Sequence, residues 1–85
     1  MTPEQVLGVI AAAVATVLEV PASSVRRETR FAQDLKADSL ALVEIVEIVE
    51  QELSSHGRPG FKIDDEDLDD LATIGDALDY ALARL

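Results

Sequence analysis

The 85-residue sequence has no cysteine, only one histidine (His56) and few basic residues. A disulfide framework, a thiolate metal site and a multi-histidine metal site are therefore excluded. The chain has no thiol of its own, so any thioester chemistry requires a sulfur from an added group. Seven Lys and Arg stand against seventeen Asp and Glu, for a formal net charge of −10. We therefore expect no nucleic acid and no anionic membrane as partner, but basic patches on other proteins.

The sequence also lacks a long apolar run and a basic start. The stretch Val6–Val20 is interrupted by Gly8, Thr16 and Glu19, and it is too short to cross a bilayer. The first residues have no positive charge of the kind that opens a signal peptide. We therefore predict a soluble, cytoplasmic protein with no membrane partner. Its length predicts one domain, residues 1–85, whose thin core leaves little room for an enclosed active site.

Hydrophobic residues recur at helical spacing along most of the chain, which predicts an all-α fold. The predicted elements are a helix from about Thr2 to Glu19, a helix from Ser39 to about Leu53, a short helix over Asp64–Leu71 and a last helix from Thr73 onward, with a loop at Ser54–Gly60. The first and last of these helices begin with capping-box patterns. Residues 20–38 form a long connection, and its apolar residues Val25, Phe31 and Leu35 are expected to anchor it to the core.

Ser39 stands where the long connection meets the second predicted helix. The first turn of a helix exposes backbone N–H groups and the positive end of the helix dipole, which would stabilise a phosphate ester there. Taken alone, a serine at this place is most often an ordinary helix cap. Asp38 beside it could cap the helix or assist a metal-dependent transferase.

The segment Asp34-Leu35-Lys36-Ala37-Asp38-Ser39-Leu40, followed by an acidic amphipathic helix, resembles the acyl carrier protein family, whose pattern is approximately D-L-G-x-D-S-L. The resemblance covers nearly the whole chain, because the family has similar residues at four further places, which are Phe31, Phe61–Ile63, Asp64–Asp67 and Thr73–Ala77. It implies a four-helix bundle with three longer helices and a short third one. It also implies that Ser39, flanked by Asp38 and Leu40, carries 4′-phosphopantetheine from coenzyme A.

The resemblance further implies a non-catalytic, monomeric carrier without a metal, which holds acyl groups as thioesters and shields them if a cleft opens between its helices. Its expected partners are a phosphopantetheinyl transferase, a ketosynthase, an acyltransferase and other synthase enzymes with basic docking patches. The expected docking residues lie on the second helix, and they are Leu40, Val43, Glu44, Glu47 and Ile48. The alternative for Glu44 and Glu47 is that they only solvate an exposed helix face.

Two features depart from the family pattern. Lys36 stands where the family usually has glycine, and at a positive φ it would cost about 1 kcal/mol or more. Its charge could also alter the choice of partner. The Ser54–Gly60 loop is several residues longer than the family norm, and it is either a mobile surface insertion or a specific contact.

The same sequence is compatible with some other functions and excludes others. The stretch Asp38–Glu44 favours polyketide over fatty-acid carriers, while an aminoacyl or peptidyl carrier and an unmodified acidic helical adaptor stay open. The acidic run Asp64–Asp70 is not an EF-hand, because Asp70 stands where that loop requires glycine and Asp76 where it requires glutamate. A hydrolytic triad of His56 with Ser54 or Ser55 is disfavoured, because residues so close in sequence at a helix end rarely converge.

Overall fold

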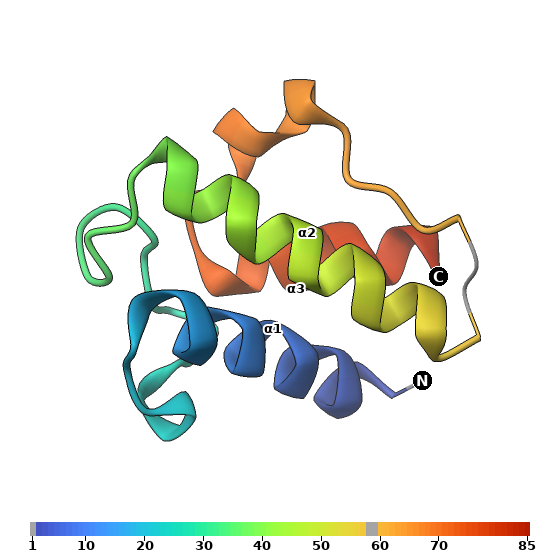
Figure 1. Ribbon diagram of the computed structural model, residues 1–85, viewed down its shortest axis with the longest axis horizontal. Coiled ribbons are helices and arrows are strands. Elements are labelled where there is room, and N and C mark those ends of the chain that lie inside the picture. Colours follow the sequence, from blue (N-terminus) through green and yellow to red (C-terminus); the bar gives the residue numbers. More distant parts are fainter. Residues whose placement is uncertain (1, 58–59) are drawn as a thin grey trace.

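Three α-helices and two short 3₁₀ helices make up the protein, as the computed structural model describes it for residues 2–57 and 60–85 (Figure 1). The α-helices are α1 (Pro3–Leu18), α2 (Ser39–Ser55) and α3 (Ile74–Arg84), and the 3₁₀ helices are η1 (Ala22–Ser24) and η2 (Asp65–Asp70). Within those residues the only β-pairing is an isolated bridge between Arg30 and Thr73. The prediction of an all-α fold is confirmed.

The first helix begins and ends where its sequence predicts. The Thr2 hydroxyl accepts the Gln5 N–H at 3.2 Å, and the Gln5 side chain accepts the Thr2 N–H at 2.8 Å. This capping box, with Pro3 at the first helical position, satisfies N–H groups that have no partner inside the helix. The helix ends at Leu18, and Glu19 follows in the left-handed conformation with φ 56°.

Two predicted elements differ from the structure. The short helix expected over Asp64–Leu71 is the 3₁₀ helix η2, because a run so rich in aspartate has low α-helix propensity and repels itself. The short helix is thus present at the predicted place, whereas the loop predicted at Ser54–Gly60 begins later than expected, since Ser54 and Ser55 belong to α2. The helix is therefore two residues longer than predicted, and the Ser55 hydroxyl donates to the Gln51 carbonyl at 3.0 Å in this last turn. Arg58 and Pro59 lie outside the described residues.

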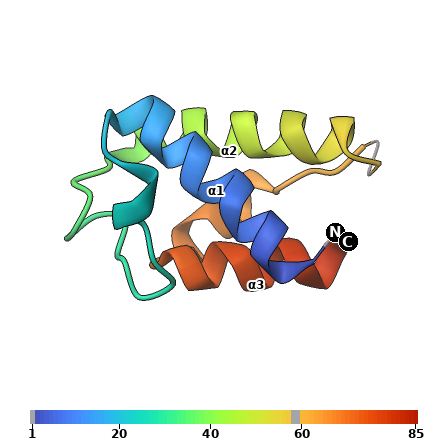
Figure 2. The ribbon, with the colours of Figure 1, turned by 90° about the horizontal axis from the view of Figure 1, so that it is seen from below.

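The core lies where α1 packs against both α2 and α3. Figure 2 shows α1 lying obliquely across the other two helices. The residues that are fully buried and largest are Ile10, Leu53, Ile74, Leu78, Val6 and Val14. The predicted anchors Val25 and Phe31 are buried in the same core, and Leu35 packs against it partly buried. No helix among the described residues is long and apolar enough to span a bilayer.

The long connection is tied by its backbone to the start of α3. The Phe31 N–H donates to the Ala72 carbonyl at 3.0 Å, and the Gly75 N–H donates to the Arg27 carbonyl at 2.8 Å. A β-carbon on Gly75 would lie 3.1 Å from that Arg27 oxygen, closer than side chains normally approach. Glycine at this position therefore lets the connection pack directly on α3, and this holds the segment that leads to α2.

Candidate functional site

Asp38, rather than Ser39, caps the N-terminus of α2. The Asp38 carboxylate accepts the Ala41 N–H at 2.8 Å, in the geometry of an N-cap residue with extended backbone. Ser39 is the first residue of the helix and is exposed. The ordinary capping role weighed for this serine is therefore filled by its neighbour, and the Ser39 hydroxyl stands at the positive end of the helix dipole.

The turn that precedes Ser39 is fixed by Arg30 and Asp34. The Asp34 carboxylate accepts the Arg30 backbone N–H at 2.9 Å and its guanidinium at 3.1 and 3.3 Å. Further along the turn, the Leu35 N–H donates to the Arg30 carbonyl at 3.1 Å and the Ala37 N–H to the Phe31 carbonyl at 2.8 Å. The guanidinium and N–H of Arg30 hold the pKa of the Asp34 carboxyl below its ordinary value.

Protonating Asp34 should loosen this turn. Because its pKa is lowered in the folded state, the group stabilises the fold above the ordinary aspartate pKa of about 3.9, and this stabilisation is lost as the pH falls through the lowered value. We expect the urea midpoint of the wild type to fall toward that of Asp34→Asn between about pH 5 and pH 2. Glu66→Gln, an exposed acid on η2, is the control. A constant difference between wild type and Asp34→Asn would contradict the prediction.

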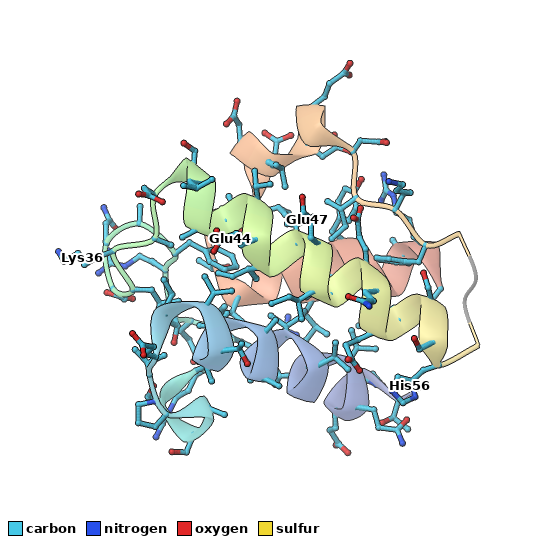
Figure 3. All side chains as sticks on the ribbon, viewed as in Figure 1. Lys36, Glu44, Glu47 and His56 are labelled. Carbon is cyan, nitrogen blue, oxygen red and sulfur yellow. The ribbon has the colours of Figure 1, made fainter. Side chains whose placement is uncertain are left out.

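Lys36 occupies the left-handed backbone region with φ 56°. Its side chain is exposed, and Figure 3 shows it projecting from the tip of the connection, away from the helices. A residue with a β-carbon is strained at this φ, as the departure from the family's glycine predicts. The position therefore combines local backbone strain with an exposed positive charge.

Replacing Lys36 by glycine should stabilise the protein by about 1 kcal/mol, because glycine adopts positive φ without a steric penalty. Chemical unfolding followed by circular dichroism measures the change. Lys36→Ala is the matched control, since it removes the charge but keeps the β-carbon and its strain. Equal stability of the glycine and alanine variants would show that charge, and not backbone strain, sets the effect.

A groove of about 480 Å³ opens beside Ser39, and its lining includes Phe31 from the connection, Leu42 from α2 and Leu68 from η2. Below it, a closed space of about 10 Å³ lies among core residues that include Phe31, Leu42 and Leu71. A space of this size holds roughly one water-sized sphere. An acyl chain would enter the interior only if the helices moved apart, so shielding of the cargo stays a prediction.

The five predicted docking residues lie along the exposed side of α2. Leu40 is 68% exposed and Val43 is 36% exposed, which is unusual for large apolar side chains. Glu44 and Glu47 are exposed as well, and Figure 3 shows both on the face of α2 turned away from α3. Ile48 differs from the other four, because it is half-buried at the seam with α1.

Comparison with known proteins identifies the family. Residues 8–81 match the family model described as "Phosphopantetheine attachment site". The chain is 38% identical over 85 residues to an acyl carrier protein of Exiguobacterium sp., with both chains covered completely. A solved structure of the acyl carrier protein from Enterococcus faecalis matches with a TM-score of 0.75 and 32% identity, again over 100% of both chains. A "Meromycolate extension acyl carrier protein" of Mycobacterium leprae is 36% identical over 80 residues, 94% of this chain and 64% of that protein.

A helical domain with a phosphopantetheine attachment region is a carrier domain. The chain belongs to the acyl carrier protein family, and it functions as an acyl carrier whose cofactor is covalently attached 4′-phosphopantetheine. Proteins of this family are modified by a phosphopantetheinyl transferase and interact with synthase enzymes. The residues around α2 fit this group, because an exposed hydroxyl stands at a helix N-terminus that already has its cap.

Proposed function

We propose that Ser39 is the attachment point of the phosphopantetheine arm and that the chain is a non-catalytic carrier subunit. The observation that supports this most is the division of roles at the start of α2: Asp38 caps the helix, and the exposed Ser39 hydroxyl is left for esterification. The dipole of α2 would stabilise the phosphate once it is attached. The arm would supply the thiol that the sequence lacks.

We propose that partners dock on α2 through Leu40, Val43, Glu44, Glu47 and Ile48. Exposed apolar residues next to Ser39 provide short-range contact, and the two carboxylates attract Lys and Arg around a partner's active site. A phosphopantetheinyl transferase, a ketosynthase and an acyltransferase would each approach this face in turn. With a net charge of −10, copies of the chain repel one another, which supports a monomer.

We further propose that the partners are separate enzymes of a polyketide or fatty-acid synthase, with polyketide synthesis favoured by the residues Asp38–Glu44. An aminoacyl or peptidyl carrier is the alternative pathway, and an unmodified acidic adaptor is the alternative class. Isolating the chain from its producing cells and identifying the released thioester by mass spectrometry separates the pathways. The cytoplasmic location stays a prediction.

The test of the carrier function is intact-mass measurement after incubation with coenzyme A, Mg²⁺ and a phosphopantetheinyl transferase. We expect a gain of one phosphopantetheine per chain, and fragmentation should place it on Ser39. A gain on another serine would overturn the assignment of the site. No gain with several transferases would favour the adaptor.

A further inference from the structure

A second groove, of about 570 Å³, lies on the seam between α1 and α2. One side of the groove is lined by Gly8, Ala12 and Thr16 of α1, and the other side is lined by Ile48 and Glu52 of α2. The groove reaches His56, which Figure 3 shows at the end of α2 opposite the connection that carries Lys36. A helix of 17 residues is about 25 Å long, so this end of the groove is far from Ser39.

The side of α1 that borders the groove is exposed but uncharged. From Gln5 to Leu18 the helix has no charged residue, although the chain as a whole is 28% charged. Its exposed positions there include Gln5, Gly8, Ala12 and Thr16, the last three spaced four residues apart in one line. Surface helices normally place charged and polar residues opposite their buried side. This side of α1 therefore resembles a surface that another molecule covers.

Gly8 is unfavourable in the middle of a helix, and nothing in the described structure requires it. A β-carbon built at this position meets no atom within 4 Å, so alanine would fit without a clash. Alanine would also be the better helix former. What glycine does provide is room for a second backbone to approach closely, as small residues do wherever helices pack tightly.

The carboxylates on the α2 side indicate the charge of the occupant. Glu52 lines the groove, and Glu44 and Glu47 line its continuation past Ile48 toward Ser39, a hollow of about 440 Å³. These acids, in a chain of net charge −10, attract a cationic partner and repel a second copy of the chain. Glu52 is within reach of a nitrogen donor at this end of the groove, because His56 Nε2 lies 3.6 Å from Glu52 Oε2.

We propose that this groove binds one helix of a partner protein, a helix with small apolar residues on one side and Lys or Arg along its edge. The outer end of the groove lies at the other end of α2 from Ser39, whereas Ile48 at its inner end is shared with the docking face proposed for the synthase enzymes.

Photo-crosslinking in the producing cells tests the proposal with the full chain. Benzoylphenylalanine replaces His56, which is exposed and lines the groove at the end far from Ser39, and in a control it replaces Ala83, exposed on α3. We expect the probe at position 56 to crosslink to one helical, Lys- or Arg-containing segment of another protein, and the probe at position 83 not to do so. Crosslinks to a second copy of this chain, the same products from both positions, or no product would each overturn the proposal.

The identified segment, made as a peptide, then provides a quantitative test. We expect Gly8→Leu to fill the groove and weaken peptide binding at least tenfold. Gly8→Ala should raise the thermal midpoint of the free chain by about 3–8 °C, which separates binding from folding. Both variants should gain phosphopantetheine at the wild-type rate. Unchanged peptide affinity of Gly8→Leu would overturn the proposal without affecting the assignment of Ser39.

Discussion

Ser39→Ala will not gain phosphopantetheine from coenzyme A, whereas the wild type gains one. The substitution removes the only atom at this position that can form the phosphate ester. It should also leave the free energy of unfolding within about 0.5 kcal/mol of the wild type, because Asp38 and not Ser39 caps α2. Intact-mass spectrometry measures the first effect, and chemical unfolding measures the second. Residual loading of Ser39→Ala would contradict the assignment.

Two controls separate chemistry from folding in this experiment. Asp38→Ala should destabilise the chain by about 1 kcal/mol, because the Ala41 N–H loses its acceptor. Ser24→Ala, which removes a hydroxyl that donates to the Pro21 carbonyl in η1, should load like the wild type. If Ser39→Ala were as destabilised as Asp38→Ala, the division of roles between the two residues would be wrong.

Leu53→Ala should be among the most destabilising single changes, at about 2–5 kcal/mol. Leu53 is 0% exposed and is the last of the buried core residues of α2, so its truncation leaves a cavity. A chain of this length has a total stability of roughly 4–13 kcal/mol, and the loss is a large share of it. Urea unfolding at neutral pH measures the change.

Leu40→Ala is the matched control, since it makes the same chemical change in the same helix. Leu40 is 68% exposed, and its truncation should alter stability by less than about 0.5 kcal/mol. It should instead slow loading by the transferase, because it removes apolar contact next to Ser39. Equal destabilisation by the two variants would contradict the description of the core, and unchanged loading of Leu40→Ala would contradict its docking role.

The helices could be predicted from the sequence because each has strong local signals. Capping boxes at Thr2 and Thr73 mark two helix starts, and both are present in the structure. The buried stripe of α2 follows from its helical periodicity, with Ile45, Val46 and Val49 all buried as that spacing predicts. The sequence predicts an end of α2 that is two residues too early, because serine is an indifferent helix former and the bond of Ser55 to a carbonyl four residues back cannot be inferred from composition.

The packing around the site could be predicted only in part. The anchors Phe31 and Leu35 follow from their apolar side chains in a polar connection. The requirement for glycine at position 75, by contrast, arises from a close backbone contact with Arg27, which is far away in the sequence. No local sequence pattern predicts this contact. Arg30 and Asp34 have opposite charges four residues apart, and this spacing indicates an ion pair. The sequence does not indicate that the Asp34 carboxylate also accepts the Arg30 backbone N–H, the hydrogen bond that fixes the turn.

The backbone pairing of the connection with α3 affects the kinetics of partner binding. The segment that leads to Ser39 is held in one conformation by Gly75 and by the Asp34 carboxylate, before any enzyme arrives. Encounter with a partner therefore requires little ordering of this segment, and most of the conformational entropy is lost during folding instead. Association then proceeds nearly as the docking of rigid bodies, whose rate is governed by the attraction between charges and falls as ionic strength rises.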